Sequence, residues 1–222
     1  MNTHWAEQFI AHQLAYSFLS KALYEPPDPE FMSVLTGQEL FADWPLDSSD
    51  VDTLTGLGLL RDFCRQWDES QTFALKQDYS RLFLGPSALL APPWESVYRS
   101  PDHLMFEKQT LEVRHEFSRF GMRIPNLTTE PEDHIGLELR FIAYLCGAGL
   151  SAIERDDAKQ FSIITQEIQH FLKEHLLQWA DECLTRIIEH SQGDYYRGVA
   201  MLTRGTLAHT SRHFEVLLKE RA

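Results

Sequence analysis

Carboxylates and a histidine gather in one short stretch of this 222-residue chain, EPEDHIGLELRFIAYL at residues 130–145. Asp133 and His134 are neighbours there, and Glu130 and Glu132 precede them. A carboxylate fits the planar guanidinium of an arginine, and a histidine that faces a groove can titrate near neutral pH. Paired carboxylates can also serve as a general acid and a general base. The stretch therefore predicts a site for a cationic partner, a catalytic or metal site, or only a well-capped helix.

A structural interpretation covers most of this stretch. Thr129-Glu130-Pro131-Glu132 fits a capping box, and proline is tolerated in the first turn of a helix. Acidic side chains favour the positive end of the helix dipole at that position. The apolar stripe that follows at helical spacing consists of Ile135, Leu139, Ile142 and Leu145. Asp133 and His134 are more than a cap requires, so they remain the candidates for function.

Other groups of residues that could form a catalytic or metal site give only weak signals. His209 and His213 are spaced i, i+4, which two metal ligands could use, but no third ligand can be assigned. The sequence contains no Walker loop, no G-x-G-x-x-G and no G-x-S-x-G motif. We therefore expect no metal and no cofactor. A small helical metal-dependent hydrolase using Asp133 and His134, and a general scaffold for apolar helices, remain as alternatives.

The elements that must position these residues are helices. Apolar residues recur at helical spacing along nearly the whole chain, and no alternating run is typical of a strand. We predict an all-α, compact single-domain bundle of about nine to eleven helices over residues 1–222. The stripe of the first helix consists of Trp5, Phe9, His12, Tyr16, Leu19 and Leu23.

Prolines, glycines and caps give the predicted boundaries. Asp28 and Pro29 are the expected N-cap and first position of a short helix. Residues 85–100 form a long proline-rich loop, which inside a compact domain is commonly functional. Ser100-Pro101-Asp102 is expected to start the next helix, and Gly121 to end it. Three last helices are expected at roughly 157–174, 175–191 and 195–219, with Asp194 as N-cap.

The composition limits the possible partners. The net charge is −13, from 33 acidic and 20 basic residues, which disfavours nucleic acid and anionic membranes and favours a basic peptide or protein. High net charge also serves solubility alone. No membrane span and no signal peptide are expected. The three cysteines fit a reducing cytoplasm rather than a disulfide framework; they are Cys64, Cys146 and Cys183.

Three motifs together carry a family resemblance: YSRLFLGP at 79–86, PPWESVY at 92–98 and the stretch at 130–145. In this order, on an all-helical chain of this length, they resemble the TorD/DmsD family of redox-enzyme maturation chaperones. The PPW-x-SV loop and the E-P-x-D-H start are most similar to the DmsD members. Tyr79 departs from that pattern, which has tryptophan there, and Glu95 stands where the pattern has glycine.

The resemblance implies a cytoplasmic chaperone that is not an enzyme. Such proteins bind the twin-arginine leader of a molybdenum-cofactor oxidoreductase, of the dimethyl sulfoxide or trimethylamine N-oxide reductase type, and delay its export until the cofactor is inserted. The Tat translocase and cofactor-biosynthesis proteins are further possible partners. Carried over by motif, the peptide-binding residues are Tyr79, Leu82, Phe83, Pro93, Trp94, Pro131, Asp133 and His134. A domain-swapped dimer and binding of guanine nucleotide or molybdenum cofactor stay open.

Overall fold

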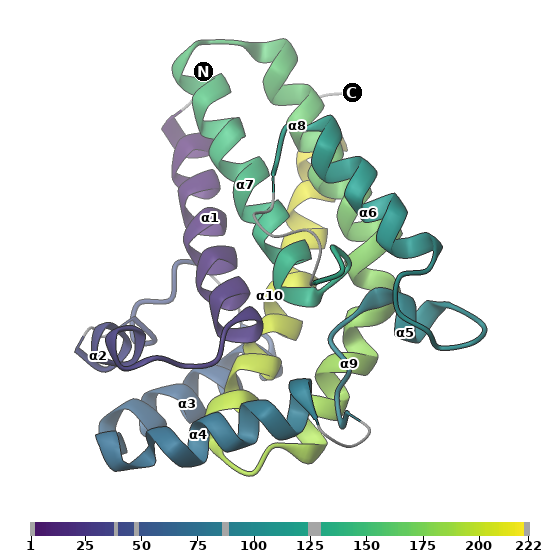
Figure 1. Cartoon of the computed structure of the whole chain (residues 1–222). Coiled ribbons are helices and arrows are strands. Elements are labelled where there is room, and N and C mark those ends of the chain that lie inside the picture. The colour runs from purple at the N-terminus through teal and green to yellow at the C-terminus, as the bar shows by residue number, and fades with distance from the viewer. Residues whose placement is uncertain (1–2, 38–39, 47–48, 86–88, 124–129, 220–222) are drawn as a thin grey trace.

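The computed structural model describes residues 3–37, 40–46, 49–85, 89–123 and 130–219 (Figure 1). Within these ranges the fold is all-α, as predicted, with ten α-helices and one isolated β-bridge. The elements are α1 (Thr3–Tyr24), α2 (Pro29–Gly37), α3 (Val51–Gln66), the 3₁₀ turn η1 (Glu69–Gln71), α4 (Thr72–Tyr79), the π-helical η2 (Ser80–Leu84), α5 (Glu95–Arg99), α6 (Lys108–Arg119), α7 (Ile135–Glu154), α8 (Ala158–Phe171), the π-helical η3 (Leu172–Leu176), α9 (Leu177–His190) and α10 (Asp194–Lys219).

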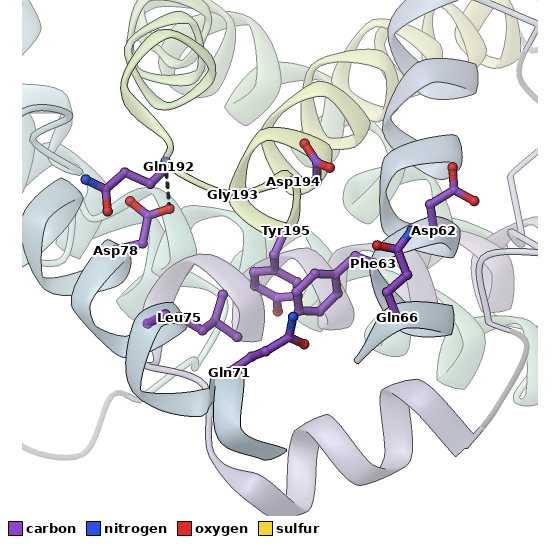
Figure 2. A pocket seen from close by; sticks show the side chains of 11 residues that line it. Asp62, Phe63, Gln66, Gln71, Leu75, Asp78, Gln192, Gly193, Asp194 and Tyr195 are labelled. Carbon is purple, nitrogen blue, oxygen red and sulfur yellow. Dashed lines mark hydrogen bonds between the residues drawn. The ribbon is translucent and has the colours of Figure 1, made fainter. Parts of the chain in front are cut away.

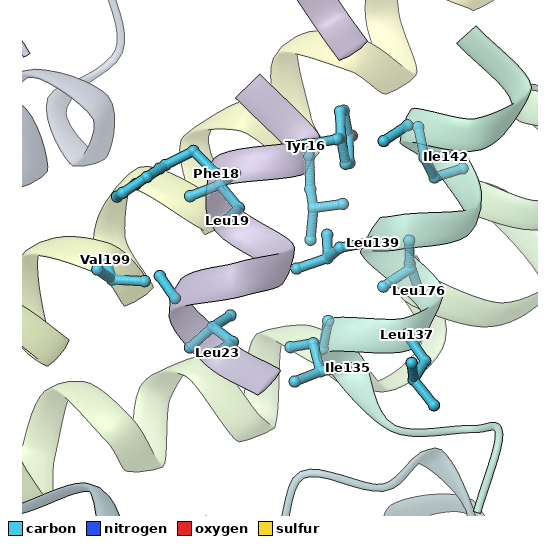
Figure 3. Packing of buried hydrophobic residues seen from close by; sticks show 14 of the residues in the cluster. Tyr16, Phe18, Leu19, Leu23, Ile135, Leu137, Leu139, Ile142, Leu176 and Val199 are labelled. Atoms are coloured by element: carbon cyan, nitrogen blue, oxygen red, sulfur yellow. The ribbon is translucent and has the colours of Figure 1, made fainter. Parts of the chain in front are cut away.

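Helices α1 and α7 lie side by side and contribute much of the apolar core (Figure 1). Figure 3 shows Tyr16, Leu19 and Leu23 of α1 beside Ile135 and Leu139 of α7, and all five side chains are fully buried. Their spacing of three or four residues places them on one face of each helix. Both predicted stripes are therefore confirmed as core, apart from Trp5, which is only partly buried. Helix α10 packs along α3 in the same way.

The predicted break between two helices at residues 174 and 175 is wrong. Residues 158–190 are helical throughout, and α8 passes into α9 through the π-helical segment η3. A π turn accommodates an extra residue without ending the helix. Leu172, His175 and Leu176 of this segment are buried, so the wider turn keeps the apolar face directed inward.

The proline-rich loop also differs from the prediction. Its end, Glu95–Arg99, is the short helix α5, whereas Ser100-Pro101-Asp102 is followed by a turn and α6 starts only at Lys108. His103 and Phe106 adopt φ values of 53° and 63°, which no right-handed helix accommodates. Gly121 (φ 77°) follows the end of α6 as expected.

Helix α7 starts later than the capping-box prediction requires. Its first residue is Ile135, and the N-cap is His134, which is extended at φ −75° and ψ 132°. Thr129, the predicted cap, lies outside the described residues. Glu132 and Asp133 form a turn, and His134 pairs with Trp94 in an isolated bridge, so the acids at 130–133 precede the helix.

Among the described residues, α7 is also the one helix whose length and composition would suffice to cross a membrane. Of its most apolar window, 67% is buried inside the protein, as expected of a core helix.

Candidate functional site

The second and third sequence motifs meet at the N-terminus of α7. The backbone N–H of Glu95 donates to the carbonyl of Asp133 at 2.9 Å, and the N–H of Ile135 donates to the carbonyl of Pro93 at 2.7 Å. Together with the bridge between Trp94 and His134, these bonds attach the proline-rich loop to α7. The backbone therefore brings Trp94 next to the residues that sequence reasoning selected from 130–134.

The Asp133 carboxylate is fully buried and is used inside the protein. One oxygen accepts from the backbone N–H of Ser96 at 2.8 Å, and the other accepts from the hydroxyl of Thr110 at 2.8 Å. Burial raises the pKa of Asp133, although both of these hydrogen bonds act in the opposite direction. Asp133 thus connects the start of α7 to α5 and α6, and both of its carboxylate oxygens are bonded within the fold.

His134 is buried as well, with 4% of its surface exposed. Its Nδ1 accepts from the backbone N–H of Gly136 at 3.0 Å, which caps α7. The ring makes edge contacts with Trp94 and Tyr24, at centroid distances of 6.0 and 5.1 Å. Burial, followed by the charge of Arg140, lowers the pKa of His134 to about 3. The condition under which this ring could titrate near neutral pH, exposure to a groove, is therefore not met in this structure.

Substitution of His134 by asparagine should make the protein less sensitive to acid. Asparagine can still accept from the Gly136 N–H but cannot be protonated. An unfolded histidine has a pKa of about 6.5, whereas burial holds the pKa of folded His134 at about 3. This group's contribution to stability is therefore present above about pH 6.5 and is lost as the pH falls toward 3. Between pH 7 and pH 5 the loss is about 2 kcal/mol.

Urea unfolding at pH 7 and pH 5 measures this effect. His134→Asn should lose about 2 kcal/mol less than the wild type over the interval. Buried carboxyl groups with raised pKa values, such as Glu167, contribute with the opposite sign, but they are the same in both proteins. His115→Asn, at an exposed position of α6, is the control. Equal losses of unfolding free energy in the wild type and in His134→Asn would contradict the conclusion that His134 caps α7 as a neutral imidazole.

The other two acids of the stretch have different surroundings. Glu132 is buried and forms a two-contact ion pair with Arg114. Glu130 is half-buried, and its carboxylate accepts from the indole N–H of Trp94 at 2.7 Å. Burial raises the pKa of Glu130. Of the three acids and the one histidine at 130–134, Glu130 is thus the residue whose charge reaches the surface.

The remaining predicted residues, except Trp94, belong to the core. Tyr79, Leu82 and Phe83 have at most 3% of their surface exposed, and Pro93 and Pro131 are buried. The Tyr79 hydroxyl donates to the carbonyl of Tyr24 at 2.7 Å. These side chains pack beneath the protein surface. They would have to become accessible before they could contact a peptide directly.

Trp94 and Glu130 border a surface that sequence reasoning did not identify. We call it the Trp94 patch, and its half-buried members are Tyr24, Glu25, Trp94, Glu130 and Arg140. The Arg140 guanidinium lies over the Tyr24 ring at 4.9 Å and is 3.5 Å from the Glu25 carboxylate. Tyr24 and Glu25 come from the end of α1, and no local signal connects them to α7. The patch offers aromatic faces and carboxylates, a combination that suits a guanidinium group.

The structure also settles how the predicted metal ligands lie. His209 and His213 lie near a third histidine, His12, at ring-centroid distances of 5.9 and 5.1 Å from it. His12 is fully buried, and its Nδ1 bonds the carbonyl of Gln8 at 2.7 Å. Among the described residues, however, no group of three or more possible ligands has an arrangement that could hold a metal ion. The metal-dependent hydrolase therefore gains no support from this geometry.

A separate pocket of about 300 Å³ lies where α3 and α4 face the turn between α9 and α10 (Figure 2). Phe63, Leu75 and Tyr195 provide its apolar part. Asp78 binds the backbone N–H of Gln192 at 3.0 Å and pairs with Arg81, so its carboxylate connects α4 to the turn. The Asp78 carboxylate is thus bonded within the fold. The pocket is distinct from the Trp94 patch.

Comparison with known proteins gives consistent matches. The family model described as "Nitrate reductase delta subunit" matches residues 48–185. The "Probable Tat proofreading chaperone DmsD" of Haemophilus influenzae is 30% identical over 187 residues, which cover 83% of this chain and 81% of that protein. "Chaperone protein TorD" of Vibrio cholerae is 27% identical over 146 residues, covering 66% of this chain and 64% of that protein.

A solved structure agrees at the level of the fold. It is a crystal structure from Archaeoglobus fulgidus described as that of a redox enzyme maturation protein, with a TM-score of 0.53 and 17% identity. The match covers 87% of this chain and 92% of that one. The predicted family resemblance, including the similarity to DmsD members, is thereby confirmed.

Proposed function

The chain belongs to the TorD/DmsD family of redox-enzyme maturation chaperones, and from this premise we propose that it binds the twin-arginine leader of a molybdenum-cofactor oxidoreductase at the Trp94 patch. Two of its relatives carry the name Tat proofreading chaperone. The chain is accordingly a binding protein rather than an enzyme. Asp133 and His134, which a hydrolase would have used, are occupied by hydrogen bonds within the fold.

The observation that carries this proposal is the pairing of Trp94 with Glu130 at the surface. The indole N–H bonds the carboxylate, which orients both the flat ring and the charge. An incoming arginine can stack on an aromatic face while its N–H groups reach a carboxylate. The protein's own Arg140 already makes such contacts with Tyr24 and Glu25. The net charge of −13 further favours encounter with a basic leader.

A matched pair of leaders tests the proposal. Isothermal titration uses a synthetic leader from a molybdoenzyme encoded next to this protein and a version with both arginines changed to lysine. We expect the lysine leader to bind about tenfold or more weakly, because lysine lacks the planar, multiply donating group. Equal affinity would favour the general apolar-helix scaffold instead. The absence of binding to either leader would contradict the proposed function.

Several finer points belong to the same proposal. We propose that residues 1–222 act as one chaperone domain in the cytoplasm. There the bound leader is withheld from export until the cofactor is inserted. A reductase of the dimethyl sulfoxide or trimethylamine N-oxide type is the expected client, and the Tat translocase and cofactor-biosynthesis proteins are expected further partners. The buried residues Tyr79, Leu82 and Phe83 contribute by supporting Tyr24 and the loop, since Tyr79 bonds the Tyr24 backbone.

A further inference from the structure

A second surface feature begins where the Trp94 patch ends. Helices α1 and α2 and the segment 40–45 enclose an apolar groove of about 350 Å³. This volume lies within the range of ordinary binding pockets. We call it the α1–α2 groove; its lining residues are Leu14, Ser17, Phe18, Lys21, Phe31, Val34, Leu35, Leu40, Asp43, Trp44 and Pro45. Figure 1 shows α2 near the end of α1 that also carries Tyr24.

Large apolar side chains stand exposed at the mouth of this groove. Leu14 is 58% exposed, Val34 is 53% exposed and Ile10, one turn before Leu14, is 47% exposed. A cluster of exposed apolar residues beside a groove is typical of an interaction surface. Trp44 adds an aromatic ring to the lining of this groove.

The groove is continuous with the Trp94 patch along one face of α1. Leu14, Ser17, Lys21 and Tyr24 follow one another at spacings of three or four residues, so they share a face. The rise of a helix places Tyr24 about 15 Å from Leu14. An apolar helix of roughly ten residues has the same length.

The charges are arranged to fit a peptide with a basic head. Glu25 and Asp28 lie at the end of the groove nearest the Trp94 patch, and Lys21 pairs with both, at 2.7 and 3.6 Å. Glu130 adds a further acid beyond Tyr24. The opposite end, at Ile10 and Leu14, is apolar. A leader with a basic head followed by an apolar stretch matches this order of acidic and apolar surface.

We propose that the apolar segment of the leader lies as a helix in the α1–α2 groove, while its arginine pair occupies the Trp94 patch. The inference rests on the proposed function and adds the location and orientation of the bound leader. It assigns Leu14, Val34 and Trp44 to partner binding, none of which belongs to the three sequence motifs.

Charged substitutions at the exposed mouth test the groove. Leu14→Glu and Val34→Asp place a carboxylate in the path of the apolar segment without entering the core. Matched controls are Leu111→Glu on α6, where the leucine is 59% exposed, and Val216→Asp on α10, where the valine is 55% exposed. Each variant is titrated with the full leader and with a head peptide that ends after the arginines. Circular dichroism confirms that each variant is folded.

We expect Leu14→Glu and Val34→Asp to weaken binding of the full leader at least tenfold and to leave the affinity for the head peptide unchanged. The two controls should bind both peptides as the wild type does. Wild-type affinity of both groove variants for the full leader would overturn the groove while leaving the proposed function intact. A wild type that binds no leader would overturn both. The two failures are thus distinguishable.

A second readout locates the bound segment directly. A leader that carries a photoreactive phenylalanine analogue in its apolar stretch is cross-linked to the protein, and the labelled residues are mapped by mass spectrometry. Labelling of α1 near Leu14, of α2 near Val34 or of Trp44 would support the proposal. Labelling confined to helices outside the groove would overturn it.

Discussion

Asp133→Ala should lower the free energy of unfolding by about 3 kcal/mol, measured by urea denaturation at pH 7. The wild-type carboxylate is fully buried and accepts from the Ser96 backbone and the Thr110 hydroxyl, both at 2.8 Å. Hydrogen bonds to a charged acceptor contribute about 1.5–3 kcal/mol each, and their loss leaves a buried N–H without a partner. Leader affinity should fall only indirectly, because the loop that carries Trp94 loses its anchor.

Asp133→Asn separates the charge from the geometry. The amide oxygen can accept from the Ser96 N–H, and the amide nitrogen can donate to Thr110, since a hydroxyl both donates and accepts. We expect it to lose about 1 kcal/mol and to retain leader affinity near the wild-type value. If Asp133→Ala instead keeps wild-type stability but loses leader binding, then the carboxylate contacts the leader directly, as the sequence motif suggested, and the buried geometry does not describe the bound state.

The site was only partly predictable from the sequence. Sequence reasoning selected residues that lie together in the structure, because Trp94, Asp133 and His134 meet at the start of α7. It could not distinguish residues that build the site from residues that face a partner. An acid before a helix reads the same in sequence whether it points to solvent, as Glu130 partly does, or inward to two donors, as Asp133 does.

Helices and boundaries were predictable to different degrees. The apolar stripes of α1 and α7 follow from spacing alone, and both are buried as expected. The passage from α8 to α9 could not be predicted, because a π turn leaves no simple residue signature. The late start of α7 depends on backbone pairing with Pro93 and Glu95, some 40 residues earlier. Tyr24 and Glu25 joined the site by packing of α1 against α7, which no local motif encodes.

The acids at 130–133 have different structural roles. The buried Glu132 pairs with the exposed Arg114, and the buried Asp133 accepts from Ser96 and Thr110, so the two acids fix the loop and α6 against α7. Glu130 orients Trp94 at the surface. A leader bound at the proposed site would therefore meet a preformed surface whose supporting bonds are already made, which reduces the ordering cost of binding.

Trp94→Ala should weaken leader binding by about 100-fold, which corresponds to about 2.7 kcal/mol. The ring is half-buried and its N–H is fixed on Glu130, so it offers a rigid aromatic face at low entropic cost. Tryptophan side chains of this kind dominate the energetics of peptide interfaces. Because part of the ring is already exposed, we expect the loss of folding stability to be smaller than for Asp133→Ala.

Two further variants make this result specific. Trp67→Ala removes a half-buried indole at the end of α3, outside the patch, and should leave leader affinity unchanged. Glu130→Gln keeps an acceptor for the Trp94 N–H but removes the charge. It should therefore weaken binding of the arginine leader and reduce the difference in affinity between the arginine and lysine leaders. If Trp94→Ala and Trp67→Ala reduce affinity equally, the effect is general destabilisation. In that case the leader binds away from the Trp94 patch.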